Sequence, residues 1–193
     1  MRLFVALALP AQVADELDRV VAPLRPAWPS LRWTGRDAWH LTLAFLGRVD
    51  ERVVGRLSEE LAGTAAEHPR LALSLHRAGA FPESGRHARV LWIGVRDYQH
   101  GLQGLAGSVG RAAGKAGAPP AERGREYHPH LTLARCREPV DVRQLLADLR
   151  DYAGTPWVAG EIYLIRSHLG AHPRYETLGA WPLRSDDPVG TEG

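Results

Sequence analysis

The string His-Leu-Thr-Leu-Ala occurs twice in this chain of 193 residues, at positions 40–44 and again at positions 130–134. A five-residue identity within one chain of this composition arises by chance only about one time in fifty. The two copies lie 90 positions apart, which is too long for a solenoid repeat and is typical of a duplicated half-domain. The order of the predicted elements agrees, because each half reads helix, strand, helix, strand, strand.

Each copy is predicted to lie on a strand, where side chains alternate between the two faces. His40 and Thr42 then share one face, and the leucines beside them point into a core. His130 and Thr132 repeat this arrangement. If the two halves pack about a pseudo-twofold axis, the two polar faces line opposite walls of one cleft.

Two imidazoles and two hydroxyls that converge on one ligand suit chemistry at phosphorus. Histidines have pKa values near 6.5, so one can act as a base while the other acts as an acid. Such a pair deprotonates the incoming oxygen and protonates the departing one. Threonine hydroxyls can hydrogen-bond the non-bridging phosphate oxygens. The symmetry of the two motifs does not assign the acid and the base.

Hydrophobic periodicity predicts an α+β chain with strands and helices in both halves. Asp50 is expected to cap the N-terminus of the second helix. Residues 1–184 are expected to form one domain, followed by a flexible tail over 185–193. The predicted strands cover 2–9, 39–46, 71–75, 91–95, 130–136, 158–169 and 174–183, and the helices cover 10–24, 50–61, 102–109 and 142–149.

Composition excludes several classes of protein. Hydrophobic residues make up 45% and charged residues 24% of the chain, and no apolar run approaches the roughly 18 residues of a membrane span. Cys136 is the single cysteine, so an internal disulfide and a cysteine zinc cage are excluded, and the cytoplasm is the expected location. A net charge of +2 argues against a broad nucleic-acid footprint. Neither motif has a third ligand nearby and no phosphate-binding loop occurs, so we expect no metal and no cofactor.

Two His-x-Thr-x motifs half a chain apart resemble the 2H phosphoesterase superfamily. Within it, the chain is similar to the RNA 2′,3′-cyclic phosphodiesterases, historically called 2′-5′ RNA ligases. That resemblance implies a bilobal α+β fold with pseudo-twofold symmetry, an antiparallel sheet in each lobe, helices packed outside and the active site between the lobes. It rests on the strings RLFVALALP, WHLTLAFLG, GAFPE, RVLWIGV, HPHLTLARC, LIRSHLG and RYETLGAWPL, which together cover nearly the whole chain.

The resemblance also implies an activity and a role for each motif residue. The implied reaction opens a 2′,3′-cyclic phosphate at an RNA 3′ end with water and leaves a 2′-phosphate. His40 would be the proton donor to the leaving 3′ oxygen, and His130 would be the proton acceptor that activates water. Thr42 and Thr132 would bind the phosphate. Weak joining of RNA ends through a 2′-5′ bond is the implied reverse reaction. From the residues themselves, we expect no membrane and no obligate protein partner.

Other residues near the motifs are further candidates for the site. Arg135 matches the resemblance as a phosphate ligand, although strict alternation would send it to the core face unless a bulge re-aims it. His128, Phe45 and Arg125 are candidate substrate contacts. The alternatives are a core position for Phe45, a surface position for His128 and a solvated loop position for Arg125. Three further aromatic residues are expected mainly in the core, with stacking on a terminal base as the alternative; they are Trp39, Phe81 and Trp92. Arg166 and Ser167 match the resemblance without a role that the residues indicate.

Two other functions remain open at this point. The chain could hydrolyse a small cyclic phosphate of the nucleotide or ADP-ribose type, and activity on a mononucleotide would favour that reading. It could also bind RNA ends without catalysis. A binding module would show salt-sensitive affinity and no turnover, and it would not require both His40 and His130.

Overall fold

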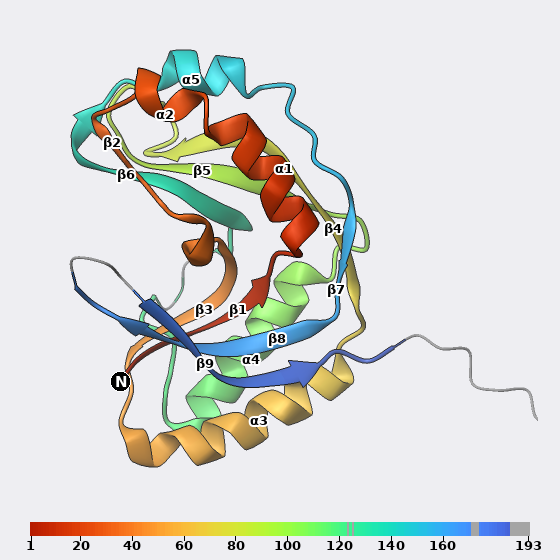
Figure 1. The fold of residues 1–193 in the computed structure, drawn as a ribbon. Coiled ribbons are helices and arrows are strands. Elements are labelled where there is room, and N and C mark those ends of the chain that lie inside the picture. Colours follow the sequence, from red (N-terminus) through yellow and green to blue (C-terminus); the bar gives the residue numbers. More distant parts are fainter. Residues whose placement is uncertain (123, 125, 171–173, 186–193) are drawn as a thin grey trace, which may run out of the picture.

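The computed structural model describes residues 1–122, 124, 126–170 and 174–185. These residues form two antiparallel sheets (Figure 1). The first sheet has the order β3 (His40–Arg48), β1 (Arg2–Ala8), β8 (Glu161–His168) and β9 (Arg174–Pro182). The second sheet has the order β2 (Leu31–Trp33), β6 (His130–Val140), β5 (Ala88–Asp97), β4 (Leu71–Phe81) and β7 (Trp157–Ala159).

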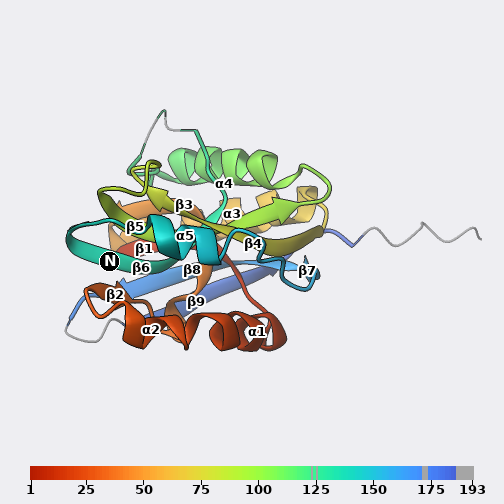
Figure 2. The same ribbon diagram turned by 90° about the horizontal axis from the view of Figure 1, so that it is seen from above.

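Helices flank both sheets, as Figures 1 and 2 show from two directions. Helices α3 (Val54–Glu67) and α4 (Leu102–Ala116) pack against the first sheet. Helices α1 (Ala11–Val21), α2 (Leu24–Ala27) and α5 (Arg143–Asp148) lie beside the second sheet. Two 3-10 turns, η1 (Arg36–Ala38) and η2 (Glu51–Val53), precede β3 and α3. The predicted α+β fold with an antiparallel sheet in each lobe is therefore confirmed.

Each sheet takes strands from both halves of the sequence. Strands β1 and β3 of the first half pair with β8 and β9 of the second half. Strands β2, β4 and β5 of the first half pair with β6 and β7 of the second. The two lobes are thus not the two halves of the sequence, because the chain passes from one lobe to the other after β1, β2, α3, β5, α4 and β7.

The two motif strands carry a β-bulge at the same position. Each time the register shifts between the threonine and the alanine, so Leu43 is the extra residue in β3 and Leu133 is the extra residue in β6. The leucine and the following alanine then both face the core. The next residue, Phe45 or Arg135, returns to the face that carries the histidine and the threonine. We call the face that carries His40 and Thr42 in the first sheet, or His130 and Thr132 in the second, the His–Thr face of that sheet.

Most predicted elements are present, with a few differences at their ends. The Asp50 carboxylate accepts a hydrogen bond from the Arg52 amide and caps η2, which leads into α3. The helix expected over 10–24 breaks near Pro23, whose ring nitrogen has no proton to donate. The strand expected over 158–169 divides at Gly160. Of the tail expected over 185–193, only Ser185 belongs to the described residues, and among those residues no helix is long and apolar enough to cross a membrane.

Candidate active site

The two motif strands, β3 and β6, contact each other where the two sheets meet. His40 is the first residue of β3, and His130 is the first residue of β6. Each strand pairs with a central strand of its own sheet, β1 or β5. The fold therefore brings the two His-Leu-Thr-Leu copies together, one from each antiparallel sheet.

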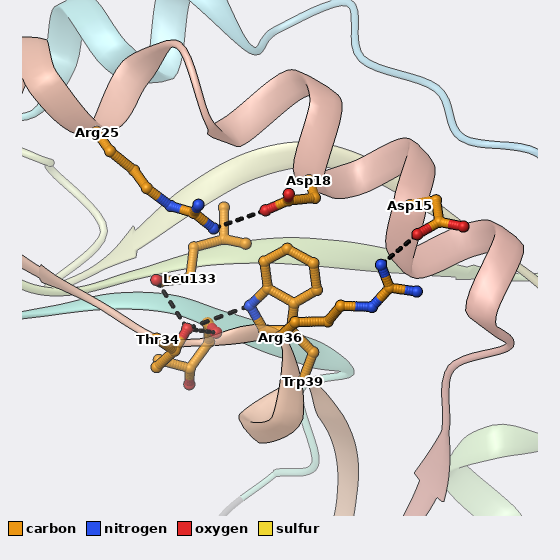
Figure 3. Close-up of polar contacts among 8 residues, drawn as sticks. Asp15, Asp18, Arg25, Thr34, Arg36, Trp39 and Leu133 are labelled. Carbon is orange, nitrogen blue, oxygen red and sulfur yellow. Dashed lines mark hydrogen bonds and ion pairs between the residues drawn. The ribbon is translucent and has the colours of Figure 1, made fainter. Parts of the chain in front are cut away.

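Residues ahead of the first histidine hold the second motif strand in place (Figure 3). The Thr34 hydroxyl lies 2.7 Å from the Thr132 carbonyl oxygen and 2.8 Å from the Leu133 carbonyl oxygen, so its proton is shared between them. The Thr34 amide also donates to the Leu133 carbonyl at 2.8 Å. The Trp39 indole donates to the Thr34 hydroxyl at 3.3 Å.

A reciprocal contact holds the first motif strand. The Tyr127 hydroxyl donates to the Thr42 carbonyl at 3.1 Å, and the Ala121 amide donates to the Phe45 carbonyl at 2.8 Å. Burial raises the pKa of Tyr127 far above its usual range, so this hydroxyl stays protonated and remains a donor. Each motif is therefore anchored by the segment that precedes the other motif's histidine.

The turn that leads into His40 is tied to helix α1 (Figure 3). The Arg36 guanidinium of η1 forms an ion pair with Asp15 and donates to the Ala11 carbonyl at 3.0 Å. A second pair, Arg25 with Asp18 at 2.7 Å, links α2 to α1. Ion pairs of this kind contribute little stability singly. Together they hold α2 and the turn before His40 against α1.

The His40 ring is half-buried against two other aromatic rings. Its centroid lies 5.6 Å from that of Phe4 and 5.2 Å from that of Tyr175, both in edge contact. Burial lowers the pKa of His40 from its ordinary value of 6.5, and hydrogen bonding with the Ala38 backbone and the charge of Asp37 act in the opposite direction. Sequence reasoning missed Phe4 and Tyr175, because their strands meet β3 only in the folded sheet.

His130 is surrounded by rings on the opposite lobe. Its centroid lies 5.2 Å from Phe81, 6.1 Å from Trp92 and 6.0 Å from His128. Its Nδ1 lies 2.7 Å from the His128 carbonyl oxygen. Since a carbonyl only accepts, Nδ1 carries the proton and Nε2 keeps a free lone pair. Burial lowers the pKa of His130, the His128 backbone raises it, and the charges of His128 and Arg135 lower it further.

The remaining motif residues are available on the same face. Thr42 and Thr132 are half-buried, and within the described part of the chain neither hydroxyl has a hydrogen-bond partner. The bulge places Arg135 on the His–Thr face of the second sheet, where it is exposed. Phe45 lies on the His–Thr face of the first sheet, with the Arg2 guanidinium 4.8 Å from its ring centroid.

The other candidates have different outcomes. The His128 ring contacts Trp92 at 4.8 Å and borders His130. Trp39 is buried in the core, as expected. The expectation of a core position was wrong for Phe81 and Trp92, which are half-buried on the His–Thr face beside His130. Arg125 lies outside the described residues.

A metal centre has no ligand set in this part of the molecule. Within residues 1–122, 124, 126–170 and 174–185, no group of three or more His, Cys, Asp or Glu side chains could hold a metal ion. The geometry instead gathers two neutral imidazoles, two hydroxyls and one guanidinium. These groups can hold a phosphate and move protons to and from it.

An intertwined α+β fold with a His-x-Thr pair from each sheet defines a class of paired-histidine proteins. Residues 9–171 match the model of the 2′-5′ RNA ligase superfamily, and the chain belongs to this family. It is 37% identical over 134 residues to the RNA 2′,3′-cyclic phosphodiesterase of Escherichia coli, covering 69% of this chain and 71% of that protein. The enzyme of the same name from Methanothermobacter thermautotrophicus is 28% identical over 95% of this chain and 99% of that protein.

Another relative and two solved structures extend the comparison. The chain matches the RNA 2′,3′-cyclic phosphodiesterase of Geobacillus stearothermophilus with 31% identity over 93% of its own length but only 56% of that protein. The crystal structure of TT0787 from Thermus thermophilus is similar with a TM-score of 0.80 and 26% identity, over 97% of this chain and 100% of that one. Escherichia coli LigT complexed with 3′-AMP has a TM-score of 0.76 and 29% identity, over 94% and 97%.

Proposed function

We propose that this protein hydrolyses 2′,3′-cyclic phosphate ends of RNA to 2′-phosphate ends by acid–base catalysis between His40 and His130. One observation carries the proposal: two strands that begin with the same five residues contact each other, and each presents a histidine and a threonine on its His–Thr face. The names of the relatives support the substrate, because they are RNA 2′,3′-cyclic phosphodiesterases.

His130 is the proton acceptor in this mechanism. Its Nε2 lone pair removes a proton from water while Nδ1 stays bonded to the His128 carbonyl. The water oxygen forms a new bond to phosphorus as the bond from phosphorus to the 3′ oxygen breaks. His40 gives its proton to that 3′ oxygen, so a 3′-hydroxyl and a 2′-phosphate result. The same sequence with a 5′-hydroxyl in place of water forms a 2′-5′ phosphodiester and frees the 3′-hydroxyl, and it is the proposed source of weak 2′-5′ ligation.

Substrate charge brings His40 into the protonated form. Burial leaves both histidines largely neutral in the free protein at pH 7, but a bound phosphate anion favours the charged imidazolium. The hydroxyls of Thr42 and Thr132 and the Arg135 guanidinium bind the non-bridging oxygens and stabilise the charge that develops there. Phe45, His128 and Arg125 are proposed contacts to the terminal nucleotide.

We expect the pH profile of kcat/KM to be a bell centred below pH 6.5. The rate falls toward acid as His130 takes up a proton, and toward alkali as His40 loses one. Burial lowers both pKa values from 6.5, so both limbs move toward acid. In kcat, the bound phosphate raises the pKa of His40 and moves the alkaline limb to higher pH. Initial rates between about pH 5 and 8 measure both profiles.

Asp37→Asn provides the matched variant for this profile. The charge of Asp37 raises the pKa of His40, so its removal is expected to move the centre of the kcat/KM bell further toward acid. A wild-type bell centred above pH 6.5, or a flat profile, would contradict paired catalysis by these two half-buried histidines.

The direct test is phosphorus NMR of a short RNA that ends in a 2′,3′-cyclic phosphate, incubated with the protein and EDTA. A 2′-phosphate signal establishes the reaction, the bond that breaks and independence from added metal. A 3′-phosphate product would reverse the assignment of the leaving oxygen. Turnover of a cyclic mononucleotide with none of the RNA would favour the small-molecule hydrolase. Salt-sensitive RNA binding without turnover would identify a binding module.

A further inference from the structure

A second arginine stands directly opposite Arg135 in the second sheet. Strand β2 pairs with the outer edge of β6, and in this register Arg32 faces Arg135. Strand β2 is only three residues long and was not predicted from the sequence. Its position is nevertheless well fixed, because the Thr34 amide and hydroxyl, next to its end, bond to the Leu133 and Thr132 carbonyls (Figure 3).

Both arginines lie on the His–Thr face. The residues before and after Arg32, Leu31 and Trp33, pack into the core together with their partners Cys136 and Ala134. Because side chains alternate along a strand, Arg32 points to the other face. That face also carries His130 and Thr132, and Arg32 is exposed on it.

The pairing places two positive charges side by side on the sheet. Like charges directly opposite one another on neighbouring strands destabilise a sheet. Within the described ranges, neither Arg32 nor Arg135 has a carboxylate or any side-chain hydrogen-bond partner. The charge of Arg135 reaches the active site, since it contributes to the lowered pKa of His130. Two guanidiniums held side by side without an acid form a site for anions.

We propose that Arg32 binds the internucleotide phosphodiester on the 5′ side of the terminal nucleotide, while Arg135 binds the cyclic phosphate. This inference rests on the proposed function. An RNA with a 2′,3′-cyclic end continues only through its terminal 5′ oxygen, so its next negative charge is that phosphodiester. Opposite residues on neighbouring strands lie about 5 Å apart at Cβ, and repulsion spreads the two guanidiniums toward two separate phosphates. The site then selects a terminal dinucleotide over a cyclic mononucleotide.

The test compares two dinucleotides that both end in a 2′,3′-cyclic phosphate. One has a normal phosphodiester between its nucleosides, and the other has an uncharged methylphosphonate of similar shape. We expect the wild-type protein to prefer the charged linkage by about tenfold in kcat/KM, the scale of one charge-assisted hydrogen bond. In Arg32→Gln, the ratio of the two kcat/KM values is expected to fall to about one.

Arg19→Gln is the matched control, because Arg19 is an exposed arginine on α1 that lies outside the second sheet. It removes the same charge and is expected to keep the tenfold preference. The inference is overturned if Arg32→Gln keeps the preference, or if the wild type does not distinguish the two linkages. Absence of wild-type turnover with both dinucleotides would instead remove the proposed function itself, and this inference with it.

Discussion

Alanine at His40 or at His130 is expected to lower kcat by about 10²–10⁴-fold, the usual contribution of one positioned acid or base. Each imidazole stands on the His–Thr face of its sheet, against aromatic rings and outside the main core. The loss should therefore be catalytic, with a thermal unfolding midpoint close to that of the wild type. Because the two groups act in one step, the double variant should lose far less than the product of the single losses. Initial rates on the cyclic-phosphate RNA measure these effects.

A modified leaving group separates the two roles. When sulfur replaces the 3′ bridging oxygen of the cyclic phosphate, the leaving thiolate needs no proton from an acid. His40→Ala should then recover most of its lost activity, whereas His130→Ala should remain slow. If His130→Ala recovers its activity on this substrate and His40→Ala does not, His130 is the proton donor and His40 the proton acceptor. His87→Ala, at an exposed histidine in the β4–β5 connection, is the matched control and should behave as the wild type does.

Gly79→Ala is expected to have the largest effect on stability. A Cβ built at Gly79 lies 2.1 Å from the Trp92 ring, which covers this glycine from the neighbouring strand. Trp92 also packs against Phe81 and His128, so the ring cannot move without disturbing the surroundings of His130. We expect a loss of about 1–3 kcal/mol or more in the free energy of unfolding, together with a lower kcat.

Denaturant unfolding followed by tryptophan fluorescence, and initial rates on the same RNA, measure both effects. Gly63→Ala in α3 is the control, because nothing lies within 4 Å of a Cβ at that position. Alanine there should stabilise the helix by up to about 1 kcal/mol. A Gly79→Ala protein as stable and active as the wild type would show that the Trp92 ring does not cover this glycine.

The sequence predicted the parts of the site that depend on local pattern. The repeated motif placed His40 and Thr42 on one face, as it placed His130 and Thr132, because alternation along a strand needs no knowledge of the partner strand. The N-terminal cap at Asp50 was predicted from its residue type and its place just before a helical pattern. These features depend on residues that are neighbours in the chain.

The features that the sequence did not predict depend on pairing between distant strands. For Arg135 the sequence left the core face and a bulge as alternatives, and the register of β6 against β5 decides for the bulge. Strand β2 is too short to show a periodicity of its own and exists through its bonds to β6. Tyr175 reaches His40 from the far edge of the first sheet. Such contacts are long-range, and one sequence holds no local signal for them.

The crossing of the chain between the lobes affects how the protein folds. Neither half of the sequence contains a complete sheet. The first sheet combines β1 and β3 from the first half with β8 and β9 from the second, and the second sheet combines β2, β4 and β5 from the first half with β6 and β7 from the second. A fragment of either half would expose unpaired strand edges, which are sites of aggregation. We therefore expect the two lobes to unfold together as one cooperative unit. The spacing between His40 and His130 is set by the same pairings that keep the whole chain folded.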